Sequence, residues 1–351
     1  MIRSIRIQNF KSHEDTRISL GRLTMLVGMN GVGKTSALEA LSACTGGLRL
    51  GFASQFPGLE CFSKLIRSGA SSFHLSAELD DEAKIDIAAP IDGAHPCRAR
   101  VEISDGTRVD GWEPDFEAVH LLGVWNQRLP SSFTLRLSAS AIARPSRLAG
   151  NTTISEDGSG LAAAIAKIKL QDPERLASIV EQVRAIVPEV RGLTADIVDI
   201  RSDGRTEGGA ELLVDFVNAS RVKAALVSEG TLLVIGLATF LSGVEGEQLL
   251  LFDDIERALH PRAQDDVMRM LRLFLDLYPG LQIVATTHPP YLIDSLGPEE
   301  VVVLARDANW IPRAKLLSQH PRASRLLEVL TTGELLGAEG EGWVLDGRET
   351  M

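Results

Sequence analysis

The sequence has little of what would assign a protein to a class at once. It contains 3 cysteines in 351 residues, scattered and without a CxxC pair. Their number and spacing exclude a disulfide framework and a zinc site of the paired-cysteine type, and they fit a reducing compartment. Basic residues are outnumbered by acidic ones, which gives a net charge of −11. This balance argues against a generally basic surface for nucleic acid, although it does not exclude a local basic patch.

Long hydrophobic runs are also absent. The most apolar stretch, residues 231–241, is too short and too interrupted to span a bilayer. Residues 1–7 alternate polar and apolar side chains and lack the apolar stretch of a signal peptide. We therefore expect a cytoplasmic protein that makes no membrane contact.

What the sequence does contain is a phosphate-binding loop. Residues 28–35, Gly-Met-Asn-Gly-Val-Gly-Lys-Thr, match G-x-x-x-x-G-K-[ST] without a mismatch. An apolar run at 23–27, typical of a buried strand, comes before the loop, and a helical pattern at 36–43 follows it. Strand, glycine-rich turn and helix form the context that this motif requires.

The chemistry of the loop follows from its residue types. Glycines let backbone N–H groups close around an anion, and the N-terminus of the following helix adds its dipole. Lys34 supplies a positive charge, and the Thr35 hydroxyl is a ligand for the Mg²⁺ that bridges the outer phosphates. The loop therefore predicts binding of ATP with Mg²⁺. The residues expected to hold the nucleotide are Gly28, Asn30, Gly31, Val32, Gly33, Lys34, Thr35 and Ser36.

A second motif, which is acidic, lies far along the chain from the phosphate loop. Residues 248–256, Gln-Leu-Leu-Leu-Phe-Asp-Asp-Ile-Glu, predict a buried strand whose carboxylates emerge at the carboxyl edge of a sheet, where open α/β sheets bind ligands. Asp253 is the candidate ligand for Mg²⁺, directly or through water. Like charges at Asp253, Asp254 and Glu256 also favour a bound cation. The alternative is a solvated acidic turn after a buried strand.

Two shorter signals accompany these motifs. Ser228-Glu229-Gly230 opens an apolar helix at 231–242, and a Ser-x-Gly at a helix N-terminus is either an anion site or a plain N-cap. His288 closes a predicted strand at 282–286. A lone histidine is usually structural, but this one stands where ligands of such sheets bind.

In order and spacing, the motifs resemble the heads of RecF/SMC-type ABC ATPases. The resemblance begins with Asn-Phe-Lys-Ser at 9–12, between strands at 2–7 and 16–20, and extends through the phosphate loop to residue 291. It implies an α/β P-loop NTPase fold of the ABC-type head, with an antiparallel β lobe and an inserted helical lobe. The helical segments at 161–168 and 173–186 show no sustained heptad repeat, so we expect a compact head without a long coiled coil.

Such a head would form one compound domain over residues 1–351. Short strands are expected at 73–79, 84–87 and 98–103 in the β lobe, and a helix at 324–330 in the tail. The expected lobes are 1–45 (Walker A), 46–150 (β lobe and loop-rich insertion), 151–225 (helical and strand insertion), 226–305 (Ser-x-Gly, Walker B and switch histidine) and 306–351 (C-terminal tail).

The resemblance also implies roles for single residues. Lys11 and Ser12 would lie beside the nucleotide; the alternative is a solvated turn. Ser228, Glu229 and Gly230 would reach the γ-phosphate of ATP bound by a second copy, so that two copies enclose two ATP molecules.

Two further roles concern hydrolysis. His288 would contact the γ-phosphate and the attacking water, and Lys34 would act with it in catalysis. The position of Asp254 normally holds a glutamate that orients this water. The shorter side chain predicts slow hydrolysis, unless Glu256 substitutes for it. The glutamine that reaches Mg²⁺ in such heads is not identified, since Gln55 and Gln127 both fit the order of the sequence.

These implications support a cytoplasmic ATPase that dimerises around ATP, with a higher oligomer as an extension, and that regulates a separately encoded effector such as a nuclease in anti-phage defence. The alternative is a RecF-like protein of DNA repair that binds DNA directly. A transporter subunit fits poorly, because Ser-Glu-Gly replaces the Leu-Ser-Gly-Gly-Gln of that class.

Overall fold

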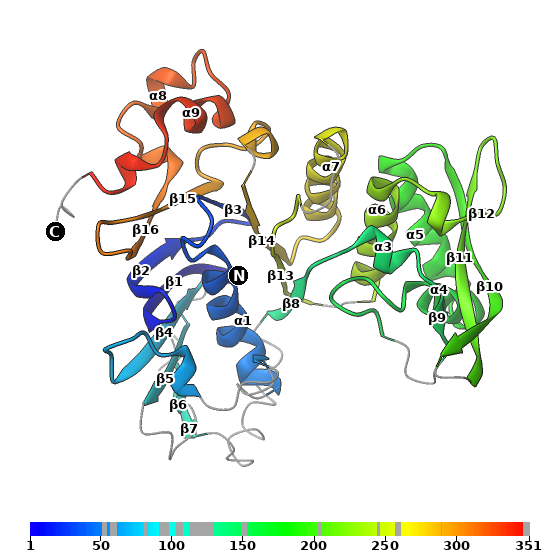
Figure 1. Ribbon diagram of the computed structural model, residues 1–351, viewed down its shortest axis with the longest axis horizontal. Coiled ribbons are helices and arrows are strands. Elements are labelled where there is room, and N and C mark those ends of the chain that lie inside the picture. Colours follow the sequence, from blue (N-terminus) through cyan, green and yellow to red (C-terminus); the bar gives the residue numbers. More distant parts are fainter. Residues whose placement is uncertain are drawn as a thin grey trace. The chain divides into compact units, whose positions relative to one another are not determined.

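The computed structural model describes residues 1–50, 55–56, 62–80, 83–90, 98–102, 108–112, 130–148, 153–202, 205–243, 246–256, 261–288 and 290–346 (Figure 1). The chain divides into two compact units. The first comprises Met1–Thr134, Gly246–Ile255 and Tyr278–Met351, and the second comprises Leu135–Glu245 and Glu256–Leu277.

The first unit contains an antiparallel sheet with the order β2-β1-β4-β5-β6-β7. In β1 the side chains of Ile2, Ile5 and Ile7 are buried, as the alternation of the N-terminal sequence predicts. This sheet is the expected antiparallel β lobe. Its strands are β1 (Ile2–Phe10), β2 (His13–Ser19), β4 (Ser72–Leu79), β5 (Lys84–Pro90), β6 (Arg98–Glu102) and β7 (Arg108–Trp112).

A second, mixed sheet of the same unit has the order β16-β15-β3-β14-β13-β8. Neighbours among β13, β14, β3 and β15 pair in parallel, and β16 is antiparallel to β15. Every residue of β3, β13 and β14 is buried, as expected for parallel strands covered on both faces. The strands are β3 (Leu23–Val27), β8 (Ser131–Leu135), β13 (Gln248–Phe252), β14 (Leu281–Thr287), β15 (Val301–Arg306) and β16 (Pro312–Leu316).

Helix α1 (Lys34–Leu50) begins within the phosphate loop and contacts strands of both sheets, among them β1 and β4 of one and β13 and β14 of the other. Its buried face shares one apolar core with β1, β4, β5 and β15. Phe10 anchors this core, with its ring edge-on to Phe73 at 5.3 Å between centroids. The phosphate loop is thus attached to a helix that is packed into a buried apolar core.

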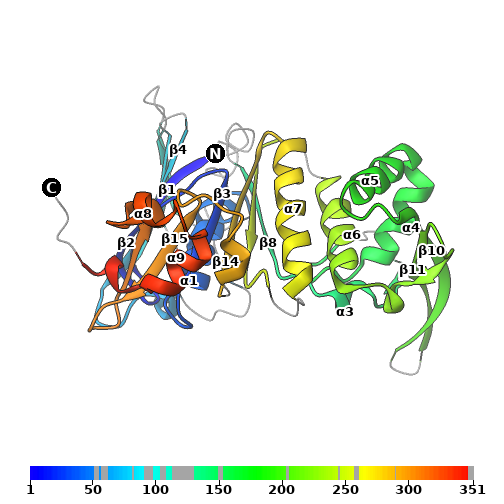
Figure 2. The same cartoon turned by 90° about the horizontal axis from the view of Figure 1, so that it is seen from above.

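The second unit contains the inserted helical lobe (Figures 1 and 2). Helices α4 and α5 pack against the long hairpin of β10 and β11, and α6 contacts α3, α5 and α7. The longest helices in the described residues, α1 and α7, have 17 residues each, so no long coiled coil occurs there. The elements are α3 (Ala139–Ile142), β9 (Ser146–Arg147), α4 (Leu161–Gln171), α5 (Pro173–Ile186), β10 (Val190–Ser202), β11 (Arg205–Phe216), β12 (Val222–Lys223), η3 (Ala224–Leu226), α6 (Glu229–Leu241) and α7 (Pro261–Leu277).

The tail differs from the prediction. The helix expected at 324–330 is a single turn, α8 (Ala323–Leu326), and the glycine-rich stretch after it forms a helix, α9 (Thr332–Glu339). The Thr331 hydroxyl accepts the Glu334 backbone N–H, and the Glu334 carboxylate accepts the Thr331 N–H. This capping box offsets the helix-weakening glycines that hid the helix in the sequence. The remaining short elements are η2 (Phe62–Leu65), η4 (Pro290–Ile293), η5 (Leu317–Gln319) and η6 (Gly342–Val344).

Gln127, one of the two glutamines considered for Mg²⁺, falls outside the described residues. Gln55 is described, and its side-chain oxygen accepts the Ser42 hydroxyl at 2.8 Å. In the described part of the chain, no helix has the length and apolar character needed to cross a bilayer.

Candidate nucleotide-binding site

The phosphate loop runs from the end of β3 into α1 and requires glycine at two tight positions. A Cβ on Gly28 would lie 2.3 Å from the Leu304 carbonyl oxygen of β15, and a Cβ on Gly33 would lie 2.7 Å from His13 Nε2. Both glycines also have positive φ, +149° and +104°. Only glycine fits both the space and the backbone angles, so neighbouring elements shape the loop around the path that the motif predicts.

Lys34 is buried at the first turn of α1, with 5% of its surface exposed. Its ammonium donates to the carbonyl oxygens of Gly28 at 2.6 Å and Met29 at 3.2 Å. A third neighbour is His288 Nδ1, at 3.3 Å. Because an ammonium has no acceptor, this ring nitrogen takes the acceptor role and Nε2 carries the hydrogen. The structure therefore brings Lys34 and His288 together at the mouth of the loop.

Asp253 lies directly after β13 and faces the loop. Its Oδ1 accepts the Thr35 hydroxyl at 3.0 Å and the Thr286 hydroxyl at 3.1 Å. The two residues expected to hold Mg²⁺, Thr35 and Asp253, are therefore in direct contact. Thr286 is an addition that the sequence did not single out, and its Oγ1 also accepts the backbone N–H of Asp254 at 2.7 Å. This threonine orients both acidic residues.

Replacing Thr286 with valine should lower kcat for ATP hydrolysis about tenfold, because both hydrogen bonds that orient Asp253 and Asp254 disappear while the shape of the side chain is kept. Steady-state phosphate release checks this expectation. Thr239→Val, a buried threonine of α6 that donates to a helix carbonyl, is the matched control. Equal kcat in the two variants would contradict the role given to Thr286.

Asp254 and His288 face one another, with 3.6 Å between Asp254 Oδ1 and His288 Nε2. The Asp254 backbone has φ +52°, in the left-handed region. Aspartate and asparagine adopt this conformation more readily than other residues with a side chain, because their short polar groups bond locally. The backbone thus gives a physical reason for an aspartate where the resemblance implies a glutamate.

The turn at 9–12 reaches the loop through Ser12. Ser12 Oγ lies 3.0 Å from where a Cβ of Gly33 would be, and it is buried with no hydrogen-bond partner in the described part of the chain. Lys11 is placed differently, because its ammonium pairs with the Glu39 carboxylate of α1. The Ser12 hydroxyl therefore lies beside the phosphate loop, whereas Lys11 forms an ion pair with Glu39.

His13, which follows this turn, also supports the loop. The ring is fully buried, with Nε2 at 3.0 Å from the Gly33 carbonyl oxygen and Nδ1 at 2.9 Å from Thr16 Oγ1. Burial lowers the pKa of His13 to about 4, against the opposing hydrogen bond to Gly33. The ring is therefore neutral in the folded protein at physiological pH.

This burial predicts an acid sensitivity. The unfolded chain protonates His13 near pH 6.5, and the folded chain only near pH 4. The free energy of unfolding is therefore highest above pH 6.5. It falls by about 3 kcal/mol as the pH is lowered from 6.5 to 4, because the unfolded state binds the proton first. Urea unfolding across this window should show a smaller pH dependence for His13→Gln than for the wild type. A pH dependence of His13→Gln equal to that of the wild type would contradict this role of His13.

Ser228 occupies the N-cap of α6 in the second unit. Its Oγ accepts the Thr231 backbone N–H at 3.4 Å and donates to Thr231 Oγ1 at 2.8 Å. Ser228 and Glu229 are exposed, whereas Gly230 is buried. The N-cap role is therefore present, and the same residues remain accessible at the helix terminus.

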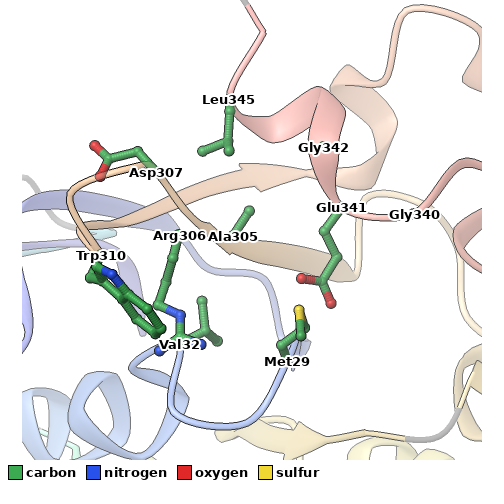
Figure 3. Close-up of a pocket in the computed structure, with 10 residues that line it drawn as sticks. All are labelled: Met29, Val32, Ala305, Arg306, Asp307, Trp310, Gly340, Glu341, Gly342 and Leu345. Atoms are coloured by element: carbon green, nitrogen blue, oxygen red, sulfur yellow. The ribbon is translucent and has the colours of Figure 1, made fainter.

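A pocket of about 580 Å³ adjoins the phosphate loop and was not expected from the sequence (Figure 3). Met29 and Val32 of the loop form one side, and the Arg306 guanidinium lies 4.3 Å from the centre of the Trp310 ring. Trp310 is 68% exposed at φ +64°, an unusual backbone angle for a bulky residue. Glu341, from the tail, completes the pocket.

The Glu341 carboxyl points toward Met29 (Figure 3). Burial raises the pKa of this carboxyl, and the Met29 backbone N–H, which it accepts, acts in the opposite direction. The positive charges of Lys34 and Arg306 attract it as well. No motif marks Glu341, because its position depends on how the tail folds back on the loop.

These residues fit ATP with Mg²⁺. The loop leaves no room for a Cβ at Gly28 or Gly33. The hydroxyls of Ser12 and Thr287 are buried without partners among the described residues. The hydroxyl and carboxylate donor set of Thr35 and Asp253 suits a hard divalent cation.

Two models of known protein families match the chain. Residues 114–294 match the family described as "AAA domain, putative AbiEii toxin, Type IV TA system", a span of just over half of the 351 residues. This chain belongs to that AAA domain family. Residues 1–87 also match the family described as "AAA ATPase domain". The N-terminal match covers the phosphate loop, and the longer match covers Asp253, Asp254 and His288.

Solved structures show the same fold. The chain is similar to an SmcHead bound to the C-winged helix domain of ScpA, with TM-score 0.55, 15% identity, and coverage of 90% of this chain and 96% of that one. An Smc head domain bound to the C-terminal domain of ScpA from Pyrococcus furiosus gives TM-score 0.54, 14% identity, and coverage of 93% and 98%. The SMC head domain of Thermotoga maritima gives 0.50, 13%, and 90% and 98%. This AAA family member therefore has an SMC-head-like fold, as the motifs predict.

Proposed function

We propose that the protein is an ATPase that binds ATP with Mg²⁺ between two copies of the chain and regulates a separately encoded effector. One observation carries the proposal. Lys34, Thr35, Asp253, Asp254 and His288 come from three separate stretches of sequence and meet at one edge of the mixed sheet, within one unit. That edge is where open α/β sheets bind ligands.

Each residue has a distinct task in this proposal. The Lys34 ammonium exchanges its carbonyl partners for phosphate oxygens. Thr35 and Asp253 hold Mg²⁺, which supplies neutralisation of phosphate charge. Asp254 accepts a hydrogen bond from the attacking water, and His288 Nε2–H orients the same region. Most of the rate enhancement then comes from positioning and charge.

Hydrolysis in this proposal is slow. An aspartate carboxylate reaches about one ångström less far than a glutamate carboxylate, and errors of this size in positioning reduce catalysis strongly. Slow turnover suits a switch whose ATP-bound state lasts long enough to be sensed by another protein.

The exposed N-terminus of α6 supports the dimer. Ser228 and Glu229 are accessible, and backbone N–H groups at a helix N-terminus attract phosphate. We assign them to the γ-phosphate of ATP bound by the second copy. The description of the matching family includes the words "Type IV TA system", and this supports action together with a second component. Our specific hypothesis for that component is a nuclease in anti-phage defence.

A native pull-down of the tagged full chain with Mg-ATP, analysed by mass spectrometry and light scattering, tests the proposal. We expect a dimer or larger assembly and a stoichiometric partner that carries a nuclease or other effector domain. Recovery of the chain with DNA, lost steeply as salt rises, would instead support a repair protein of the RecF kind.

A further inference from the structure

The C-terminal tail places the carboxylate of Glu341 beside the phosphate loop. Helix α9 ends at Glu339, and Gly340 turns the chain with φ +65° and ψ −159°, a conformation that only glycine adopts easily. Glu341 follows and points at Met29 (Figure 3). The reversal therefore delivers this side chain to the loop.

The segment after Glu341 is fixed to the mixed sheet. Trp343 and Val344 are buried, and the Trp343 ring packs edge-on against His320 at 5.0 Å between centroids. The Lys315 ammonium of β16 donates to the Asp346 carbonyl at 2.9 Å. Because η6 also contacts β15 and β16, the backbone that carries Glu341 is held beside the mixed sheet.

The same tail holds the loop that follows His288. Asp294 Oδ1 accepts the Thr331 hydroxyl at 2.6 Å and the Gly333 backbone N–H at 2.9 Å. The Thr332 hydroxyl donates to the Leu296 carbonyl at 2.6 Å. The tail is thereby connected to both sides of the proposed nucleotide site, the phosphate loop and the His288 segment.

Glu341 is a half-buried anion among cations that phosphate would use. The Met29 N–H donates to it, and the positive charges of Lys34 and Arg306 attract it. Arg306 lies beside the loop, with one terminal guanidinium nitrogen 3.6 Å from where a Cβ of Gly31 would be. A triphosphate would add several negative charges to this region, and like charges at short range in a partly buried site repel strongly.

We propose that Glu341 is an intramolecular competitor of ATP: its carboxylate occupies the positive field of the phosphate loop in the nucleotide-free chain and sets the affinity for ATP. The inference rests on the proposed nucleotide binding and adds a residue that controls it. Binding of ATP then requires the carboxylate to yield its contacts, so the position of the tail follows the nucleotide state.

Mg-ATP affinity of the full chain, measured by isothermal titration calorimetry, tests this directly. Glu341→Gln keeps the shape and removes the charge, so we expect about tenfold tighter binding of ATP. A smaller gain is expected for ADP, which brings less charge. Glu328→Gln, an exposed residue of the tail, removes the same charge away from the loop and should bind as the wild type does.

The outcomes separate this inference from the proposed function. Equal ATP affinity in the wild type, Glu341→Gln and Glu328→Gln would overturn the role of Glu341 and leave nucleotide binding intact. A wild-type chain that binds no ATP would refute both the role of Glu341 and the proposed nucleotide binding. If Glu341→Gln fails to fold, Glu341→Asp is the second variant, since it keeps the charge but places the carboxylate farther from the phosphate loop. An ATP affinity between that of the wild type and that expected for the uncharged side chain supports the inference. An unchanged affinity in Glu341→Asp would count against it.

Discussion

ATP binding should fall by at least about a hundredfold when Lys34 is replaced by alanine, because the only buried ammonium in the described part of the phosphate loop is lost. The remaining glycines still shape the loop, but its field then depends on backbone dipoles alone. Equilibrium binding of a fluorescent ATP analogue, with Mg²⁺, measures the effect.

The fold should tolerate this change. Removal of the ammonium leaves the carbonyl oxygens of Gly28 and Met29 without a donor, at a cost of about 1–3 kcal/mol, which water entering the open loop reduces. Circular dichroism and thermal unfolding check this point. Lys223→Ala, at an exposed lysine paired with Glu211 in the second unit, is the control and should bind ATP normally. Wild-type affinity in Lys34→Ala would refute the assignment of the phosphate loop.

Replacing Asp254 with asparagine should stop hydrolysis and leave ATP binding in place. The amide cannot accept a proton or orient water as the carboxylate does, so we expect kcat to fall by about a thousandfold. Asparagine suits the φ of +52° as well as aspartate does, and the Asp254 backbone N–H keeps its bond to Thr286. The variant should therefore accumulate as an ATP-bound dimer.

Light scattering with and without saturating Mg-ATP shows whether it does. Asp276→Asn, at an exposed position of α7, should hydrolyse ATP and dimerise as the wild type does. Asp254→Glu gives the opposite test, because a longer side chain should raise kcat while the left-handed backbone costs about 1 kcal/mol of stability. A monomeric Asp254→Asn chain in saturating Mg-ATP would argue against enclosure of ATP by two copies.

Much of this site was predictable because its motifs combine local backbone rules with simple periodicity. The phosphate loop directly follows the buried strand β3, and the acidic pair directly follows the buried strand β13. Parallel pairing of β3, β14 and β13 then brings their carboxyl ends to one edge, so residues 218 positions apart, Thr35 and Asp253, come within 3.0 Å.

The residues that escaped prediction act through tertiary structure. His13 carries no motif, and its support of Gly33 depends on β2 and the phosphate loop coming into contact in the folded chain. Thr286 sits inside an apolar strand, where a hydroxyl is usually a local feature. Glu341 lies in a glycine-rich tail whose helix is set by a capping box and by docking on Asp294, and composition alone favoured an irregular surface segment.

The central claim is that each ATP is held by Lys34 of one copy and Ser228 of the other. ATP hydrolysis by a mixture of two inactive variants tests this claim most directly. Lys34→Ala and Ser228→Arg should each be inactive alone. An equal mixture should recover about a quarter of wild-type hydrolysis, because half of the random dimers are mixed and each of these has one intact site of two. Activity no greater than that of the separate variants, with mixed dimers detected by native mass spectrometry, would contradict the shared site.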